Sequence, residues 1–357
     1  AQGILVQALP ARPSAHRRSA PPRGVPRSRM RSAAGVTILD GGMGHLLRRM
    51  GVEVKGEIGS VERFLGVALA NTRQPELVRA AHREYLRAGA TVLTTNSYSC
   101  VPRVVGDHKR VLEHIRAAGE HARAAADEHG QGVLVAGCLP PLNASYRADL
   151  VGPDEELDRE YALIAKAVAP YCDVFLCETM ASAREAAAAA KAASAASAAT
   201  NGQPVWVSWA LEEPAAGGGQ DAPSTLLSGE TVEQAVAALD MRPGGPIEAC
   251  LFNCSLPASI SAALPRLRRL LPEGVATGAY ANGFITVRSP GGGSSEYNKD
   301  LTPDAYAELC AEWARGGASV LGGCCGVFPE HIDAVAKRLS SAADRPTAAA
   351  QRSDARL

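Results

Sequence analysis

The chain has 357 residues, of which 46% are hydrophobic, and its 37 basic residues balance 37 acidic ones. This length is enough for one large domain or two small ones, and the zero net charge gives no electrostatic reason to expect a nucleic-acid partner. No run of 18 or more apolar residues occurs, so we expect no membrane-spanning helix.

The first 35 residues differ in composition from the rest. Residues 1–35 contain seven arginines and no acidic residue. This composition is typical of an organelle transit peptide, which would direct the protein to a chloroplast or mitochondrion. The alternative is a disordered N-terminal extension, with Met30 as a possible start and a cytoplasmic location. We exclude 1–35 from the fold, assign 36–341 to one domain, and expect 342–357 to be a disordered tail.

From residue 36 onward, short apolar runs alternate with longer helical patterns. The predicted strands are 36–40, 90–96, 132–137, 172–178, 204–210, 248–254, 274–280 and 318–322. The predicted helices are 75–88, 108–129, 154–168, 181–199, 230–240, 258–270, 303–315 and 329–340. Strands that are apolar throughout indicate burial on both faces, as in a parallel sheet covered by helices.

Eight such β/α units predict a single (β/α)8 TIM-type barrel with parallel strands. A doubly wound open sheet is the runner-up, but its Gly-rich G-x-G-x-x-G turn is absent after the first strand, which ends in DGGMGH (40–45). The Gly- and Pro-containing insert 212–228 and the RSPGGGSS stretch (288–295) are predicted to be loops.

The chain has nine cysteines, an odd number, and most of them lie in or beside apolar runs. In a chain of this length that pattern does not indicate a secreted disulfide framework, and a reducing compartment fits better. Three of them, Cys254, Cys324 and Cys325, stand at the ends of predicted strands six and eight. Barrel enzymes carry their sites at the carboxyl ends of the strands, so we expect these thiols to converge. Three sulfur ligands with an open fourth position suit a catalytic zinc ion. The other interpretations are buried core cysteines or a vicinal disulfide between the adjacent pair.

Several short motifs now form a recognisable set: LDGG (39–42), CET (177–179), FNCS (252–255), AYAN (279–282) and GGCCG (322–326). Together they resemble the homocysteine S-methyltransferase family over roughly residues 36–340. The resemblance implies that Cys254, Cys324 and Cys325 bind Zn2+ and that the homocysteine thiol takes the fourth position. Coordination would hold that thiol as a thiolate, and no further catalytic side chain is implied.

The resemblance also implies a substrate pocket beside the metal. Glu178 and Asp40 would face the amino group of the bound amino acid, because a carboxylate is a natural partner for an ammonium group. Asp40 could instead be a turn or cap residue before two glycines. Tyr280 and Asn282 are further candidates for shaping the pocket, although they could equally be loop structure.

The methyl donor is expected to be a sulfonium compound, either S-methylmethionine or S-adenosylmethionine. Betaine-using relatives carry a tyrosine after the strand-four glutamate, where this chain has Thr179, and 4% aromatic residues leave few for a cage around a quaternary ammonium. The expected partners are therefore homocysteine and a small methyl donor, with the oligomeric state left open.

Three alternative functions follow from the same residues. The first is methylation of selenocysteine or another small thiol. The second is a non-enzymatic redox sensor based on the vicinal pair. The third is an aldolase or phosphate-binding barrel, although no Schiff-base lysine stands at a strand end.

Overall fold

The computed structural model describes residues 35–56, 60–130, 132–213, 224–285 and 296–343. Within them, eight parallel strands form one sheet in the order β1-β8-β7-β6-β5-β4-β3-β2. The strands are β1 (Thr37–Ile38), β2 (Val92–Thr94), β3 (Leu134–Leu139), β4 (Val174–Met180), β5 (Val205–Trp209), β6 (Ile247–Asn253), β7 (Ala276–Tyr280) and β8 (Val320–Leu321). All eight predicted strands are confirmed.

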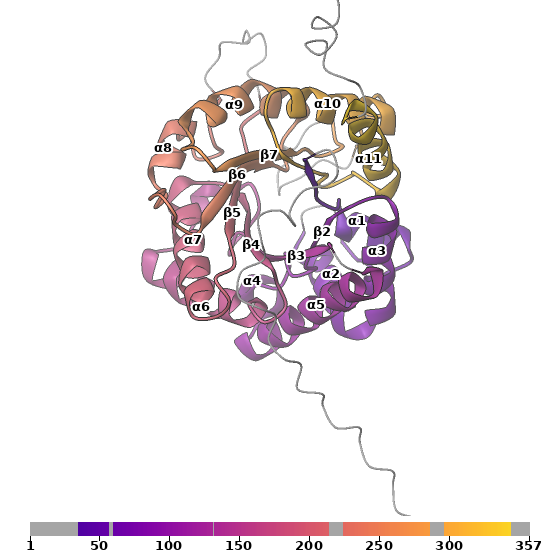
Figure 1. Cartoon of the computed structure of the whole chain (residues 1–357). Helices are drawn as coiled ribbons and strands as arrows, with labels where there is room; N and C mark the ends of the chain where they lie inside the picture. The colour runs from indigo at the N-terminus through magenta and orange to yellow at the C-terminus, as the bar shows by residue number, and fades with distance from the viewer. Residues whose placement is uncertain (1–34, 57–59, 131, 214–223, 286–295, 344–357) are drawn as a thin grey trace, which may run out of the picture.

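The sheet closes on itself between β1 and β2. Leu39 pairs with Val92 in a parallel bridge. The Thr91 amide donates to the Ile38 carbonyl at 2.7 Å, and the Asp40 amide donates to the Val92 carbonyl at 3.1 Å. A ring of helices surrounds the strands (Figure 1). The fold is therefore the predicted (β/α)8 barrel.

The helices are α1 (Met43–Arg49), α2 (Val61–Arg73), α3 (Pro75–Arg87), α4 (Pro102–Val105), α5 (His108–His129), α6 (Asp154–Val168), α7 (Ala183–Ala198), α8 (Val232–Ala237), α9 (Pro257–Leu270), α10 (Pro303–Arg315) and α11 (Pro329–Ala343). The eight predicted helices are present, with α8 shorter than expected. The helices α1, α2 and α4 were not predicted. The first of these follows two glycines and has no capping side chain, so its sequence lacks the usual start signals.

Both faces of the strands are buried, as their apolar runs predicted. Residues such as Leu176 and Leu251 fill the barrel interior, whereas Phe175 and Cys177 pack between strands and helices. Gly278 lies on the interior face, where a Cβ atom would come within 2.1 Å of the Leu251 side chain. A larger residue at this position would disrupt the interior packing.

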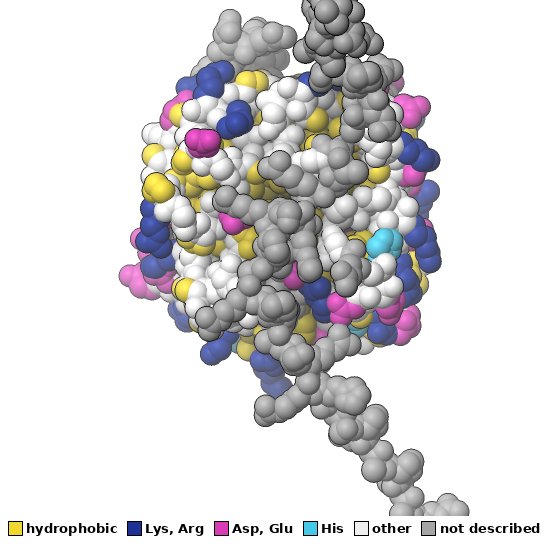
Figure 2. All heavy atoms as spheres, viewed as in Figure 1, with side chains coloured by type: hydrophobic (Ala, Val, Ile, Leu, Met, Phe, Trp, Pro, Cys, Tyr) yellow, Lys and Arg dark blue, Asp and Glu magenta, His cyan; other side chains and the backbone are white. Residues whose placement is uncertain are grey.

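The surface agrees with the balanced composition. On the face drawn in Figure 2, basic and acidic side chains are interspersed around the edge rather than separated by sign. None of the helices in the described ranges is long and apolar enough to cross a bilayer. The predicted N-terminal extension, the loop 288–295, and most of the C-terminal tail and of the insert 212–228 lie outside the described residues.

A buried histidine makes the packing of α3 sensitive to pH. His82 is fully buried, and neither of its ring nitrogens has a hydrogen-bond partner in the described chain. Burial, together with a smaller repulsion from His121, lowers the pKa of His82 to about 3. The folded protein therefore holds this imidazole neutral at pH values where an exposed histidine is already charged.

We predict that acid destabilises the protein partly through His82. Below pH 6.5 the His82 imidazole binds a proton in the unfolded chain but stays neutral in the folded one. The free energy of unfolding therefore falls as the pH falls, until the folded-state pKa of about 3 is reached. The variant His82→Leu lacks this group, so its free energy of unfolding should not show this loss. The difference between the variant and wild type should therefore grow by about 1.4 kcal/mol for each unit by which the pH falls across this window. Denaturant titrations of metal-free protein would measure the difference. An equal change in the control His129→Gln, at an exposed position, would contradict the assignment.

Candidate metal and substrate site

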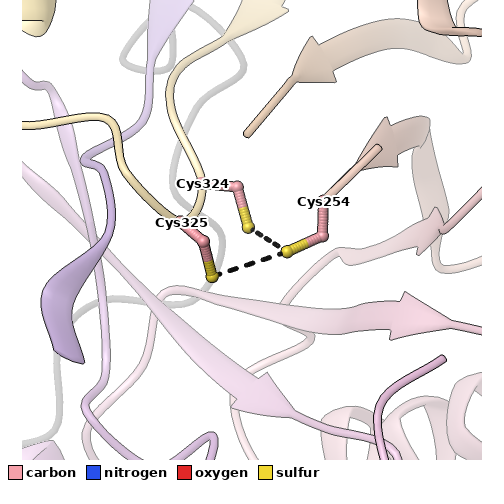
Figure 3. A group of neighbouring side chains, drawn as sticks. All are labelled: Cys254, Cys324 and Cys325. Atoms are coloured by element: carbon pink, nitrogen blue, oxygen red, sulfur yellow. Dashed lines mark hydrogen bonds between the residues drawn. The ribbon is translucent and has the colours of Figure 1, made fainter. Parts of the chain in front are cut away.

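The three predicted cysteines meet at the carboxyl ends of two strands. Cys254 follows β6, and Cys324 and Cys325 follow β8. Their sulfur atoms all lie within 4.8 Å of one another, and the three side chains point toward a common centre (Figure 3). The Sγ of Cys254 is 2.7 Å from that of Cys324 and 3.7 Å from that of Cys325. The strand-end argument thus placed these thiols correctly.

Neighbouring backbone segments hold the double-cysteine turn. The Gly323 amide donates to the Asp40 carbonyl at 2.9 Å. A Cβ atom at Gly42 would lie 2.8 Å from the carbonyl oxygen of Cys324, so the loop after β1 can pack here only without a side chain. Gly326 closes the turn with a φ of +77°, which favours glycine.

The Asn253 side chain connects the double-cysteine turn with the end of β4. Its Oδ1 accepts hydrogen bonds from the Thr179 amide at 3.0 Å and from the Ser208 hydroxyl at 2.7 Å. Its Nδ2 donates to Thr179 Oγ1 at 2.7 Å and lies 3.8 Å from Cys324 Sγ. Thr179 and Cys254 have φ values of +60° and +49°, which are unfavourable for residues with a side chain. The network therefore stabilises strained backbone on both sides of the site.

The sulfur cluster has the chemistry and spacing of a metal site. Three thiolates about 2.3 Å from one tetrahedral zinc ion are about 3.8 Å apart. The separation between Cys254 and Cys325 matches this value, while Cys254 and Cys324 are closer. Hydrogen bonding among the three thiols lowers the pKa of Cys325 well below its usual range and raises that of Cys324 well above it. Among the described residues, this is the one group of three or more His, Cys, Asp or Glu side chains whose ligand atoms are close enough to hold a metal ion.

A cavity of about 310 Å³ opens beside the cluster. All three cysteines contribute to its wall, as do Asp40 and Glu178. Aromatic side chains form a further part of the wall; they are Phe64, Tyr98, Tyr146, Tyr280 and Phe284. The cavity therefore brings sulfur, carboxylate and aromatic groups together at the strand ends.

Asp40 lies at the end of β1 and is 3% exposed. Its Oδ2 accepts the Thr94 amide at 2.8 Å and its Oδ1 accepts the Thr94 hydroxyl at 2.9 Å. Burial raises the pKa of Asp40 to about 8, although these hydrogen bonds lower it. Asp40 thus ties β1 to β2, and this structural role coexists with its position in the cavity wall.

Glu178 lies on β4 where the register with β5 shifts between Cys177 and Met180, an irregularity of the kind found beside active sites. Its Oε2 accepts a hydrogen bond from the Cys138 thiol at 3.2 Å. Burial raises the pKa of Glu178 to about 7, and no lysine or arginine in the described chain pairs with it. A buried carboxylate that lacks a cation is a natural partner for a ligand ammonium group.

The other two predicted pocket residues differ from each other. Tyr280 is 2% exposed and lines the cavity, and its hydroxyl has no hydrogen-bond partner in the described chain. Asn282 is fully buried and is not part of the cavity wall; its Oδ1 accepts from the Phe284 amide at 3.3 Å. A role for Asn282 in binding substrate remains an untested prediction.

Sequence reasoning missed several residues of the site. Cys138 was not among the predicted site residues, although it stands near the end of β3, and Asn253 was quoted only as part of a motif. Phe64, Tyr98 and Tyr146 lie on α2 and on the loops after β2 and β3, where no motif marks them. The low overall aromatic content gave a wrong impression of the cavity, because its few aromatic residues gather there.

The comparisons with known proteins agree with this geometry. The metallated form of the homocysteine methyltransferase MmuM from Escherichia coli matches with a TM-score of 0.67 at 25% identity, covering 85% of this chain and 96% of that one. Its oxidised form gives the same values. The model of the homocysteine S-methyltransferase family matches residues 37–339. The chain therefore belongs to the homocysteine S-methyltransferase family of enzymes, as its motifs predicted.

Proposed function

We propose that the protein is a zinc-dependent methyltransferase that moves a methyl group from a sulfonium donor to the thiol of homocysteine and so forms methionine. The observation that carries this proposal is the cluster of three sulfur atoms within 4.8 Å in the wall of a cavity at the strand ends. Membership of the family supports the acceptor, and the metallated form of the related Escherichia coli enzyme supports a metal.

Cys254, Cys324 and Cys325 would hold the zinc ion. A zinc ion bound there would supply one thing: it lowers the pKa of a coordinated substrate thiol, so that the sulfur is a nucleophilic thiolate at neutral pH. Three cysteine ligands leave the fourth position for that sulfur. The neighbouring protein groups then have to orient the rest of the amino acid.

Glu178 would bind the ammonium group of homocysteine. It is buried, lines the cavity and has no cationic partner in the described chain. The unpartnered hydroxyl of Tyr280 lies close enough to lower the pKa of Glu178, and it offers a second polar contact. A bound ammonium group would compensate the charge of this buried carboxylate and so reduce the cost of its burial. This gives the site a preference for amino acids.

The aromatic wall supports a cationic donor. Phe64 and Tyr98 lie with their ring centroids 6.3 Å apart, and Tyr146 lines the same cavity. Rings of this kind attract onium groups through their π faces. In the transfer, the donor carbon–sulfur bond breaks and its electron pair stays on the donor sulfur, while the acceptor thiolate forms the new bond to the methyl group. A sulfonium donor such as S-methylmethionine then leaves as a neutral thioether.

The structure also bears on the redox-sensor alternative. The Sγ of Cys254, which is not part of the adjacent pair, lies 2.7 Å from that of Cys324. A sensor based on a vicinal disulfide between Cys324 and Cys325 gives Cys254 no role and is therefore disfavoured.

The first prediction from this proposed function concerns metal and activity together. Wild type purified without chelator should contain about one zinc per chain and form methionine from homocysteine and S-methylmethionine. Cys254→Ser and Cys324→Ser should lose both properties, because each removes a ligand. Metal content by mass spectrometry and methionine by chromatography would measure the outcome, with Cys172→Ser as the control distant from the site.

Absence of zinc from wild type after anaerobic reconstitution would refute the mechanism. Parallel assays with S-adenosylmethionine and betaine, and with selenocysteine as acceptor, would identify the donor and separate the acceptors.

The second prediction tests the Asn253 network. Asn253→Asp retains oxygen acceptors for the Thr179 amide and the Ser208 hydroxyl but loses the donors to Thr179 Oγ1 and Cys324 Sγ. Zinc affinity should fall by roughly 10–100-fold, the usual effect of losing a hydrogen bond to a metal ligand or its support. Competition with a chromogenic chelator would measure it. Ser208→Ala is the control that removes one contact to Asn253 and leaves Cys324 alone. An affinity as high as that of wild type in Asn253→Asp would show that the network does not support the metal.

The third prediction concerns Glu178. In Glu178→Gln the shape is kept and the charge is lost, so the KM for homocysteine should rise on the order of 10–100-fold, as expected for a lost charge-assisted hydrogen bond. Steady-state kinetics with 4-mercaptobutyrate, which is homocysteine without its amino group, provides the control. If Glu178 binds the ammonium group, this analogue should be a poor acceptor for wild type and should not become poorer in the variant.

A further inference from the structure

One cysteine outside the sulfur cluster makes a specific contact in the site. Cys138 pairs in register with Leu176, which lies two residues before Glu178 on the neighbouring strand β4. Because side chains alternate along a strand, Leu176 and Glu178 project to the same face. The Cys138 side chain is directed to this interior face as well, and its Sγ lies 3.2 Å from Glu178 Oε2.

This thiol acts as a hydrogen-bond donor and has no role as a metal ligand. Cys138 is not a member of the group of three residues that could hold an ion. Burial and, after it, the charge of Glu178 raise the pKa of Cys138 well above its usual range, so the sulfur stays protonated. The Cys138 amide donates to Thr95 Oγ1 at 3.0 Å, which fixes the backbone from which the thiol projects.

This contact helps to fix the orientation of Glu178. Its Oε2 accepts from the thiol at 3.2 Å, and the Tyr280 hydroxyl lies close enough to the carboxylate to lower its pKa. Neither contact brings a cation to the carboxylate, so Glu178, which lines the cavity, can bind the ammonium group of a ligand. A glutamate side chain has three rotatable bonds, so an anchored oxygen removes much of the freedom that binding would otherwise have to restrict.

We propose that Cys138 is a positioning residue for the amino-acid acceptor: its thiol holds one carboxylate oxygen of Glu178 so that the other meets the substrate ammonium group. This inference rests on the proposed function, because it takes the acceptor to be an amino acid bound by Glu178. It adds a residue on β3 to the groups that act on the amino-acid acceptor.

The experiment compares three variants that separate hydrogen bonding from volume. Cys138→Ala removes the donor and leaves a small cavity, Cys138→Val removes the donor but fills the space, and Cys138→Ser restores a donor on a shorter bond. For each variant, KM for homocysteine, KM for S-methylmethionine, kcat, zinc content and the homocysteine affinity by calorimetry are measured.

We expect the KM and the dissociation constant for homocysteine to rise about tenfold in both Ala and Val variants, the effect of one charge-assisted hydrogen bond. The Ser variant should recover part of this loss. The KM for the donor and the zinc content should stay within about twofold of wild type, and the variants should show no added loss with 4-mercaptobutyrate.

Three results would overturn the inference: homocysteine affinities equal to that of wild type in both Ala and Val variants, a loss in the Ala variant that Val restores, or an equal loss for 4-mercaptobutyrate. The first two would leave the proposed function intact. If wild type itself neither binds homocysteine nor transfers a methyl group, the proposed function fails and the inference falls with it.

Discussion

The site depends on the hydrogen bonds of a single buried amide, that of Asn253. Thr179 and Cys254 both have positive φ values at the ends of β4 and β6, and a backbone of this kind persists only where its surroundings hold it. The Asn253 side chain satisfies the Thr179 amide and hydroxyl, while its own backbone leads directly into Cys254. The strand that presents a carboxylate and the strand that presents a thiol are thereby fixed relative to each other. Because the same amide reaches Cys324 Sγ, the arrangement extends to the double-cysteine turn.

A second constraint is the sign of the charge in the cavity. Three thiols and two carboxyl groups line it, together with Arg63, Arg103 and Arg147, and burial raises the pKa of both Asp40 and Glu178. Burial thus disfavours the charged form of these two carboxyl groups unless a cation binds beside them. The three ligands of the proposed reaction are all cationic at the relevant atom: a zinc ion at the sulfurs, an ammonium group at Glu178 and a sulfonium near the aromatic rings. The site is therefore complementary to its ligands through charge as well as through shape.

The sequence predicted the features that depend on the order of elements along the chain, which are the barrel and the residues at its strand ends. It did not predict which side chains contact each other between neighbouring strands. Apolar runs separated by helical patterns were enough for the barrel, and the rule that sites lie at strand ends brought Cys254 together with Cys324 and Cys325 before the fold was known. The hydrogen bond between Cys138 and Glu178 depends on the register between β3 and β4, which sequence patterns do not reveal. Likewise Phe64 reaches the cavity from α2, a helix that was not predicted although Ser60 caps its start. Strand-end position alone was therefore a good guide to which residues could enter the site and a poor guide to their partners.

The candidate metal site lies beside the shortest strands of the barrel. The strands β1 and β8 have two residues each, so few ladder hydrogen bonds hold this part of the sheet. The double-cysteine turn continues the connection beyond them: the Gly323 amide donates to the Asp40 carbonyl, and the Cys324 amide donates to the Ala281 carbonyl, both at 2.9 Å. A zinc ion shared by Cys254, Cys324 and Cys325 would join the ends of β6 and β8 across β7. Metal binding would then stabilise the same edge of the barrel that presents the substrate, which couples the integrity of the fold to the loading of the site.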